Sequence, residues 1–188
     1  TRPDIETLPK AAPVTLSRQE QEFIQSIGTL RVSNELDWPP IDYAVSAQPQ
    51  GYSVDVLKMI STMTGLKLEF VNGFSWEELV NLFNDGNLDI LQPVFLSDQN
   101  IGQASNSFLT VTYAAATRHG QSAITQLSDL KDRTIAIPTS WSIISVLRQH
   151  YPSINILEVD SPRDALEAVL NGEAFASLDA SPILHYTA

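Results

Sequence analysis

The stretch that decides the fold is GYSVDVLKMISTMTGLKLEFV, residues 51–71. Its first part carries apolar residues at helical spacing up to Gly65, which predicts an amphipathic helix that ends at this glycine. Its second part, residues 66–71, alternates apolar and charged side chains as a β-strand with one polar face does. A helix that leads directly into a strand is part of an α/β repeat, so the flanking sequence decides how far the repeat extends.

The flanking segments continue the alternation on both sides. Upstream, residues 30–33 predict a strand, and the two prolines after Trp38 predict a loop at its carboxyl end. Downstream, Ser75 and Glu78 form a capping-box pattern that opens a helix. Residues 88–91 then predict a short buried strand. The order strand, helix, strand, helix, strand indicates an open α/β sheet.

The C-terminal half predicts a second α/β unit. Its elements are a β-prone run at 108–117, a helical turn at 127–130, strands at 134–137, 154–159 and 174–178, a helix at about 143–150 capped by Ser140 or Ser142, and a helix that begins after Ser161. Ser75 to Gly86 and Ser161 to Gly172 share the same spacing of cap, acidic third residue and glycine stop. This spacing indicates an internal repeat with one copy in each lobe, although any capped three-turn helix that ends in glycine gives the same pattern.

Composition and charge narrow the functional classes. The 188 residues include 22 Asp+Glu against 11 Lys+Arg, which gives a net charge of −11, and no cysteine. A zinc finger, an iron–sulfur cluster and a thiol nucleophile are therefore excluded, and the negative charge argues against nucleic acid as a partner. Nucleotide-binding and hydrolase motifs are absent, and the three histidines lie about 30 residues apart without acidic partners at helical spacing. We expect no catalytic residue, no metal and no cofactor.

Three tryptophans carry the main signal for binding. Trp38, Trp76 and Trp141 each lie at a predicted strand-to-helix connection. In open parallel sheets, ligands bind outside the carboxyl ends of the strands, so three indole rings would line one cleft. The alternative is that each tryptophan only anchors its own loop by packing and binds no ligand. Ser140 and Ser142 begin a predicted helix whose free N–H groups suit an anion, with plain helix capping as the alternative.

Four motifs resemble one known family. They are LRV with DWPP (residues 30–40), QGYSVD (50–55), GNLDI (86–90) and LSDLKDRTIAI (127–137). Together they resemble the family-3 extracellular solute-binding domains, the periplasmic Venus-flytrap modules of polar amino-acid transporters. The W-P-P form of the first loop is most similar to the versions fused to membrane sensor kinases and cyclic-di-GMP enzymes.

The resemblance implies an α/β, two-lobed, periplasmic-binding-protein-like (type II) fold. Applied to this chain, it gives an extended leader at 1–16, lobe 1 at 17–112 and lobe 2 at 113–188. Members of the family continue beyond the last predicted strand and cross back into the first lobe, and we expect that return to be missing here. The family binds its ligand between the lobes and closes on it.

The resemblance also implies a set of site residues. By position, the ligand-binding residues are Glu35, Trp38, Trp76, Phe95, Ser97, Ser140, Trp141, Ser142 and Asp179. The arginine that clamps an α-carboxylate in amino-acid binders is replaced here, since residues 97–100 are Ser-Asp-Gln-Asn and residues 72–117 contain neither Arg nor Lys. Ala180 also stands where the carboxylate that binds the amino group is usual. A standard α-amino acid is therefore a poor candidate ligand; a less charged or stacking molecule, or no small ligand, fits better.

These expectations favour a periplasmic, small-molecule-binding sensory domain of a membrane signalling protein. Its partners would be a small-molecule ligand and a membrane-anchored remainder of the same protein, tethered to the inner membrane, with a homodimer left open. The alternatives are a free-standing solute-binding protein of an ABC transporter and, more distantly, a lyase or dehydratase on the same fold. An enzyme would need a general base in the cleft, where only Glu35 and Asp179 qualify.

Overall fold

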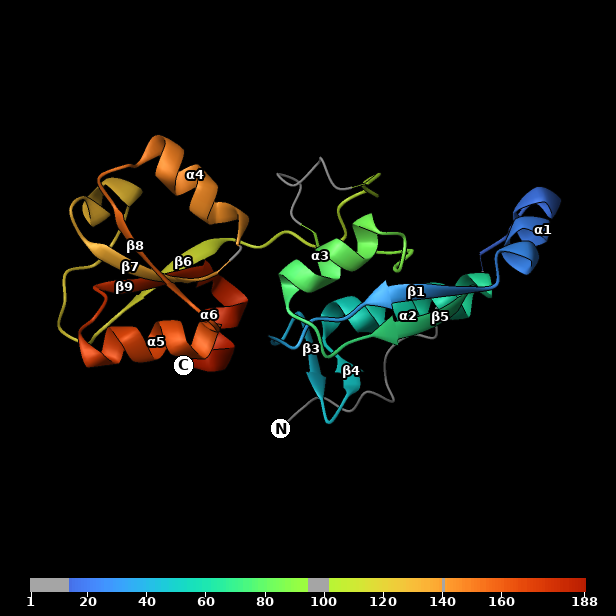
Figure 1. Ribbon diagram of the computed structural model, residues 1–188, viewed down its shortest axis with the longest axis horizontal. Helices are drawn as coiled ribbons and strands as arrows, with labels where there is room; N and C mark the ends of the chain where they lie inside the picture. The colour runs from blue at the N-terminus through green and yellow to red at the C-terminus, as the bar shows by residue number, and fades with distance from the viewer. Residues whose placement is uncertain (1–13, 95–101, 140) are drawn as a thin grey trace.

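The computed structural model describes residues 14–94, 102–139 and 141–188. Figure 1 shows two groups of elements joined by an extended segment. We call the group from α1 to α3 the N-terminal lobe and the group from β6 to α6 the C-terminal lobe. The predicted α/β class and two-lobed architecture are confirmed. The residue limits assigned to the leader and the two lobes stay a prediction.

The N-terminal lobe is built around a pair of parallel strands. These are β1 (Thr29–Ser33) and β5 (Lys67–Val71), with α1 (Arg18–Ile27), α2 (Tyr52–Thr64) and α3 (Trp76–Asn84). Both predicted capping boxes are present: the hydroxyl of Ser17 accepts from the N–H of Glu20, and that of Ser75 from the N–H of Glu78. In turn, the carboxylate of each glutamate accepts a hydrogen bond from the backbone N–H of its serine. The two bonds together order the first turn of the helix.

A small antiparallel sheet replaces the predicted loop around Trp38. It consists of β2 (Asp37–Trp38), β3 (Asp42–Val45) and β4 (Gln48–Gln50), in the order β2-β3-β4. The two prolines do turn the chain, but the turn is tight enough for Trp38 to pair with Asp42 in a hairpin. Gly51 then leads into α2 with φ +114°, and a Cβ there would lie 2.4 Å from the carbonyl oxygen of Ile41. Only glycine suits this close approach.

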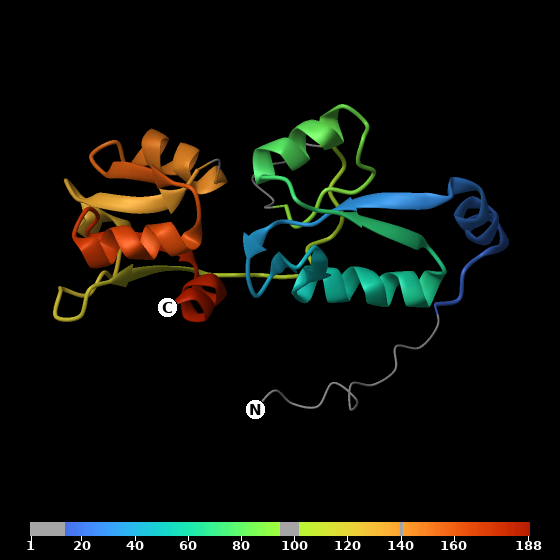
Figure 2. The same cartoon turned by 60° about the horizontal axis from the view of Figure 1, so that its bottom comes forward.

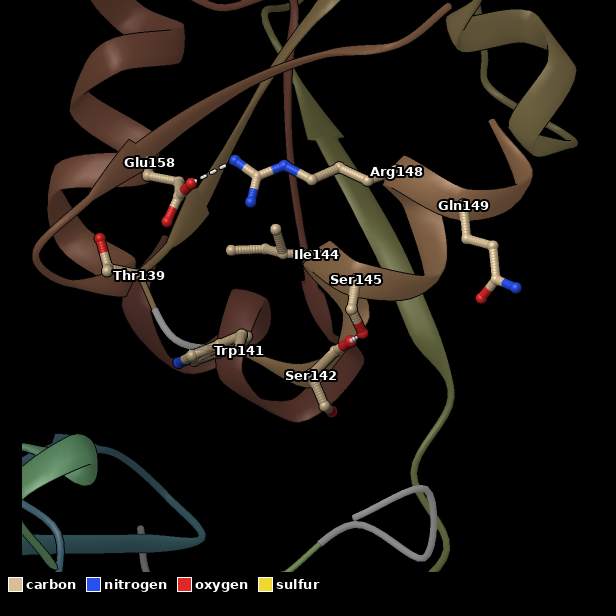
Figure 3. Close-up of a pocket in the computed structure, with 8 residues that line it drawn as sticks. All are labelled: Thr139, Trp141, Ser142, Ile144, Ser145, Arg148, Gln149 and Glu158. Carbon is tan, nitrogen blue, oxygen red and sulfur yellow. Dashed lines mark hydrogen bonds and ion pairs between the residues drawn. The ribbon is translucent and has the colours of Figure 1, made fainter. Parts of the chain in front are cut away.

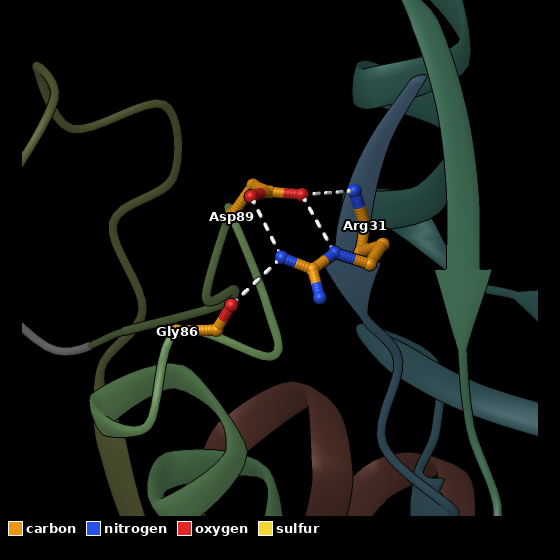
Figure 4. A network of polar contacts seen from close by, with 3 residues as sticks. All are labelled: Arg31, Gly86 and Asp89. Carbon is orange, nitrogen blue, oxygen red and sulfur yellow. Dashed lines mark hydrogen bonds and ion pairs between the residues drawn. The ribbon is translucent and has the colours of Figure 1, made fainter. Parts of the chain in front are cut away.

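The strand predicted at 88–91 is reduced to one β-bridge, between Val32 and Ile90. A side chain takes over part of the pairing (Figure 4): the carboxylate of Asp89 accepts from the backbone N–H of Arg31 at 2.8 Å and from its guanidinium at 3.0 Å. The same guanidinium donates to the carbonyl of Gly86 at 2.8 Å. These bonds with Arg31 lower the pKa of Asp89. These contacts hold residues 88–91 beside β1, although only the single bridge at Ile90 pairs them with the strand.

The C-terminal lobe has a four-stranded sheet in the order β6-β9-β7-β8. Its strands are β6 (Tyr113–Thr117), β7 (Thr134–Pro138), β8 (Asn155–Val159) and β9 (Ala176–Ala180), with β6 antiparallel to β9 and the other pairs parallel. A 3₁₀ turn, η3 (Leu127–Leu130), precedes β7. Figure 1 shows α4 (Ser142–His150) and α5 (Pro162–Asn171) on opposite faces of this sheet. The core therefore consists of two layers of apolar side chains, one under each helix.

The last helix, α6 (Ser181–Thr187), was not predicted. It begins directly after β9, and the N–H of Ser181 donates to the carbonyl of Thr112 at 2.7 Å. Figure 2 shows α6 beside the segment that joins the lobes. This position lets α6 contact the N-terminal lobe.

Three predicted boundaries in this half were wrong. The strand predicted at 174–178 lies at 176–180, because the N–H groups of Glu173 and Ala174 both bond to the carbonyl of Ala168 and extend the end of α5. The strand predicted from residue 108 covers only 113–117. Ser142 does not cap α4: it is the first helical residue, and Trp141 is the N-cap residue. Ser140 lies outside the described residues.

The internal repeat that begins at Ser75 and at Ser161 is also visible in the order of the strands. In the N-terminal lobe, β1 lies between β5 and the bridge at Ile90; in the C-terminal lobe, β7 lies between β8 and β9. The helices α3 and α5 hold the same place in both lobes, and both begin at a serine whose hydroxyl accepts from the N–H three residues later. The shared spacing therefore reflects two copies of one supersecondary unit.

We expect Ser161→Ala to lower the free energy of unfolding by about 1 kcal/mol, because the N–H of Asp164 loses its partner at 3.2 Å. Urea unfolding monitored by circular dichroism measures this change. Ser145→Ala is the matched control: its exposed hydroxyl bonds only to a carbonyl of its own helix, so a change within about 0.5 kcal/mol is expected. Equal losses in both variants would contradict a specific role for the cap.

Candidate functional site

The two lobes meet at Trp38. Its indole extends from β2 to the C-terminal lobe, where it meets Trp141 edge to face, with ring centroids 5.9 Å apart and planes at 87°. Trp38, only 7% exposed, forms one buried cluster with Ile41 of its own lobe and with Ala180 and Ile183 of the other. An edge-to-face pair with buried apolar neighbours is a stabilising arrangement of aromatic rings. We call this cluster, together with Trp141, the interlobe junction.

A second aromatic pair lies near the junction. Tyr43 of β3 faces Tyr186 of α6, with ring centroids 6.2 Å apart and planes at 45°. Both members of the small hairpin, β2 and β3, thus present an aromatic side chain to the C-terminal lobe. The unpredicted elements, the hairpin and α6, thus both take part in the contact between the lobes.

Asp179 is the carboxyl of the C-terminal lobe at this junction. It is 1% exposed at the end of β9, and the N–H of Ala180 donates to its Oδ1. Burial raises the pKa of Asp179 to about 8, a rise that the Ala180 N–H and the indole of Trp38 partly offset and that the negative charge of Glu35 adds to. The shifted strand boundary matters here, since it places Asp179 within β9.

Glu35 is the corresponding carboxyl of the N-terminal lobe. It follows β1, and its backbone N–H donates to Oδ2 of Asp42 at 2.9 Å. Burial raises the pKa of the Glu35 side chain to about 8, with further contributions from the negative charges of Asp42 and Asp37. Every charge that acts on Glu35 and Asp179 among the described residues is negative.

A buried polar cluster behind Glu35 was missed by the sequence prediction. Asp42 accepts from the amide of Asn34 at 2.8 Å and from that of Gln92 at 3.4 Å, and Gln92 also bonds to the backbone carbonyl and hydroxyl of Ser33. Burial raises the pKa of Asp42 to about 6 against the opposing effect of these donors. Polar residues next to the predicted strand ends were a usable signal: Asn34 follows β1 directly. The acceptor that these residues share, Asp42, could not be predicted, because it lies on β3 of the unpredicted hairpin.

A groove opens from the junction over the C-terminal lobe. Its volume is about 700 Å³, and its lining residues are Thr139, Trp141, Ser142, Ile144, Ser145, Arg148, Gln149 and Glu158. Figure 3 shows Trp141 and Ser142 at the end nearer the N-terminal lobe, with Arg148 reaching across to Glu158. The groove thus contains the guanidinium of Arg148, which the sequence prediction did not consider. This side chain is 61% exposed and forms an ion pair with Glu158.

The predicted site residues fall into three groups. Trp38 and Trp141 meet at the junction, Asp179 precedes Ala180 of the same cluster, and Ser142 lies in the adjoining groove. Glu35 lies in the segment between β1 and β2, next to Asp42 of its own lobe. Trp76 is half-buried at the start of α3, and its ring does not pair with either of the other two indoles. Phe95, Ser97 and Ser140 lie outside the described residues.

The arrangement offers apolar contact surface and carboxyl groups. Burial raises the pKa of Glu35 and of Asp179 to about 8, so both carboxyls favour the protonated form at neutral pH. Within the described ranges, no three His, Cys, Asp or Glu side chains are grouped to hold a metal ion. The same part of the chain contains no helix long and apolar enough to cross a membrane.

Comparison with known proteins gives three related results. The virulence sensor protein BvgS of Bordetella pertussis is 26% identical over 85% of this chain, but the match spans only 13% of BvgS. The membrane-bound lytic murein transglycosylase F of Sodalis glossinidius is 28% identical over 80% of this chain and 34% of its own length. The crystal structure of the periplasmic VFT2 domain of Bordetella pertussis BvgS matches with a TM-score of 0.79 and 24% identity, over 92% of this chain and 74% of that one.

The family itself follows from a match over most of the sequence. The model of the bacterial extracellular solute-binding proteins, family 3, matches residues 30–171, which include β5, β7, β8, the hairpin with Trp38 and the groove. The resemblance predicted from the four motifs is confirmed. This chain belongs to family 3 of the bacterial extracellular solute-binding proteins.

Proposed function

We propose that this chain is a periplasmic sensory domain of a membrane signalling protein, and that it signals through the contact between its lobes. The observation that carries the proposal is the position of Trp38, which packs against Trp141, Ala180 and Ile183 of the other lobe. The similarity to a named sensor protein and to its periplasmic VFT2 domain supports the same function. The membrane-anchored remainder of the same protein would be the partner that detects the change.

The mechanism follows from a two-state equilibrium. A molecule that binds the contacting lobes more tightly than the parted lobes shifts the equilibrium toward contact, by no more than its difference in affinity. Junction and groove offer indole surface, the hydroxyl of Ser142 and protonated carboxyls. The extended segment after residue 102 and the hairpin would adjust as the lobes move, with lobe limits near residues 112 and 113.

The ligand we propose is not a standard α-amino acid. Such a ligand carries a carboxylate that needs a cation, and the guanidinium in the adjoining groove, that of Arg148, is paired with Glu158. Its amino group needs an ionised acceptor, whereas burial raises the pKa of Asp179 to about 8. An uncharged molecule that stacks on indole, with Trp76 as a further contact, suits these groups better.

Two alternatives have specific support. A free-standing solute-binding protein fits the family description. An enzyme is favoured by one relative, the lytic transglycosylase, and would have to use Glu35 or Asp179, whose pKa burial raises to about 8, as its acid or base. The similarity to a sensor protein and to its periplasmic domain leads us to propose a binding function without catalysis.

Trp141→Ala should part the lobes while each lobe stays folded. Loss of the ring pair removes about 1 kcal/mol, which is about fivefold in the ratio of contacting to parted lobes. Small-angle X-ray scattering would report this as a larger radius of gyration. Phe23→Ala is the control, because Phe23 is 61% exposed on α1, which lies at the far end of the N-terminal lobe (Figure 1). An unchanged radius in the Trp141 variant would contradict the junction.

The ligand class is tested by thermal unfolding with two panels: the twenty standard α-amino acids, and small uncharged aromatic molecules. A ligand at about 100 times its dissociation constant stabilises by about 2.7 kcal/mol, which raises the melting temperature by several degrees. We expect such a shift within the aromatic panel, its loss in Trp38→Ala and in Trp76→Ala, and less than about 1 °C with amino acids. A shift of several degrees with any amino acid would overturn the proposed class.

A further inference from the structure

Amides from three neighbouring segments of the N-terminal lobe converge on one side chain, that of Asp42. Asn34 follows β1, Asn72 follows β5, and Gln92 follows the segment bridged to β1. The amide of Asn34 donates to Oδ1 of Asp42 at 2.8 Å, and that of Gln92 donates to the same oxygen at 3.4 Å. Asn72 supports the first of these bonds, since its amide donates to Oδ1 of Asn34 at 3.2 Å. A carboxylate of the hairpin thus lies at the carboxyl ends of the parallel segments.

The carboxylate of Asp42 accepts hydrogen bonds on both of its oxygens. Its Oδ2 accepts from the backbone N–H of Glu35 at 2.9 Å, while Oδ1 accepts from the two amides. The amide of Asn34 also donates to the carbonyl of Tyr43 at 3.1 Å, which ties the next residue of β3 to the same donor. Asp42 and Asn34 are both 0% exposed. Turning this carboxylate would leave buried donors unpaired, so one orientation is strongly favoured.

The residues around Asp42 in the hairpin take part in the contact with the other lobe. Asp42 pairs with Trp38 across the hairpin, and Trp38 meets Trp141. Ile41 belongs to the buried cluster of the interlobe junction, and Tyr43 faces a tyrosine of α6. Figure 1 shows β3 at the end of the N-terminal lobe nearer the C-terminal lobe. The hydrogen bonds of Asp42 given above, in contrast, all stay within its own lobe.

The hairpin is attached on a second side, to the start of α2. The carbonyl of Ile41 accepts from the backbone N–H of Ser53 at 3.0 Å and from its hydroxyl at 2.9 Å. The carbonyl of Pro40 accepts from the N–H of Tyr52 at 3.1 Å. These bonds hold the turn of the hairpin, whereas the carboxylate of Asp42 holds the strand that follows it. Attachment at both places is needed to fix the direction of β3 as well as its position.

We propose that Asp42 is the positioning residue of the interlobe junction: its carboxylate fixes the hairpin in the orientation in which Trp38 meets Trp141. This inference rests on the proposed function, because it treats lobe contact as the signalling state. Asp42 would act on the junction through the hairpin, without touching the other lobe itself. Lobe contact therefore depends on hydrogen bonds that lie wholly inside the N-terminal lobe.

Asp42→Asn is the variant that tests this role, because it keeps the size and shape of the side chain. It replaces one acceptor oxygen by an NH₂ group, which can only donate. In either orientation of the new amide, this group faces a donor: the N–H of Glu35 on one side or the amide of Asn34 on the other. A buried donor then lacks its acceptor, and we expect the ratio of contacting to parted lobes to fall by about tenfold.

Two measurements report the contact directly. The edge-to-face pair of Trp38 and Trp141 should give an exciton couplet in far-ultraviolet circular dichroism, and Trp141→Ala supplies the spectrum without it. We expect Asp42→Asn to lose most of this couplet and to show a larger radius of gyration in small-angle X-ray scattering. Urea unfolding would confirm that the N-terminal lobe stays folded.

Ser61→Ala is the matched control for a general loss of stability. Its hydroxyl donates to the carbonyl of Leu66 at 2.6 Å, toward the other end of α2 from the hairpin. This variant should lower the midpoint of urea unfolding while the couplet and the radius of gyration stay as in the unmodified chain. An equal loss of the couplet in Ser61→Ala would overturn the inference, since the effect of Asp42 would then be one of stability alone.

A folded Asp42→Asn chain that keeps the full couplet and the unmodified radius would also overturn the inference. In that case the proposed function stands, because the lobes still meet and only the role of Asp42 is lost. An unmodified chain whose spectrum equals that of Trp141→Ala would instead contradict the junction, and with it both the proposed function and the role of Asp42.

Discussion

The contact of Trp38 with the opposite lobe is the interaction on which the rest of the arrangement depends. Each lobe has its own parallel strands and its own helices, so neither needs the other to complete a sheet. What relates them in space is one indole seated among Trp141, Ala180 and Ile183, with a tyrosine pair beside it. A contact of this size is small beside a domain core, so modest free energies can shift the balance between contacting and parted lobes.

Local chemistry explains why most of the fold could be predicted. Capping boxes at Ser17 and Ser75, the cap at Ser161 and the stops at Gly65 and Gly172 are short-range patterns, and each governs the residues within one turn of it. The elements that were missed depend on contacts between distant residues. The hairpin of β2 and β3 requires Trp38 to pair with Asp42 across two prolines, and the boundary of β9 is set by bonds to Ala168.

The same distinction applies to the site. Trp38 and Trp141 could be chosen because the carboxyl ends of parallel strands meet at one edge, and the structure does bring them together. Trp76 obeys the same rule, yet its ring does not join the other two, since the rule gives the edge and not the direction of a side chain. The buried cluster of Asn34, Asp42 and Gln92 could not be predicted, because three segments must fold before their polar atoms can meet.

The close approach at Gly51 has a consequence for how this domain tolerates sequence change. A single methyl group there would press on the carbonyl of Ile41, and Ile41 belongs to the same buried cluster as Trp38. A substitution at position 51 should therefore reach beyond the start of α2: by displacing Ile41 it would also disturb the packing of Trp38 against the other lobe.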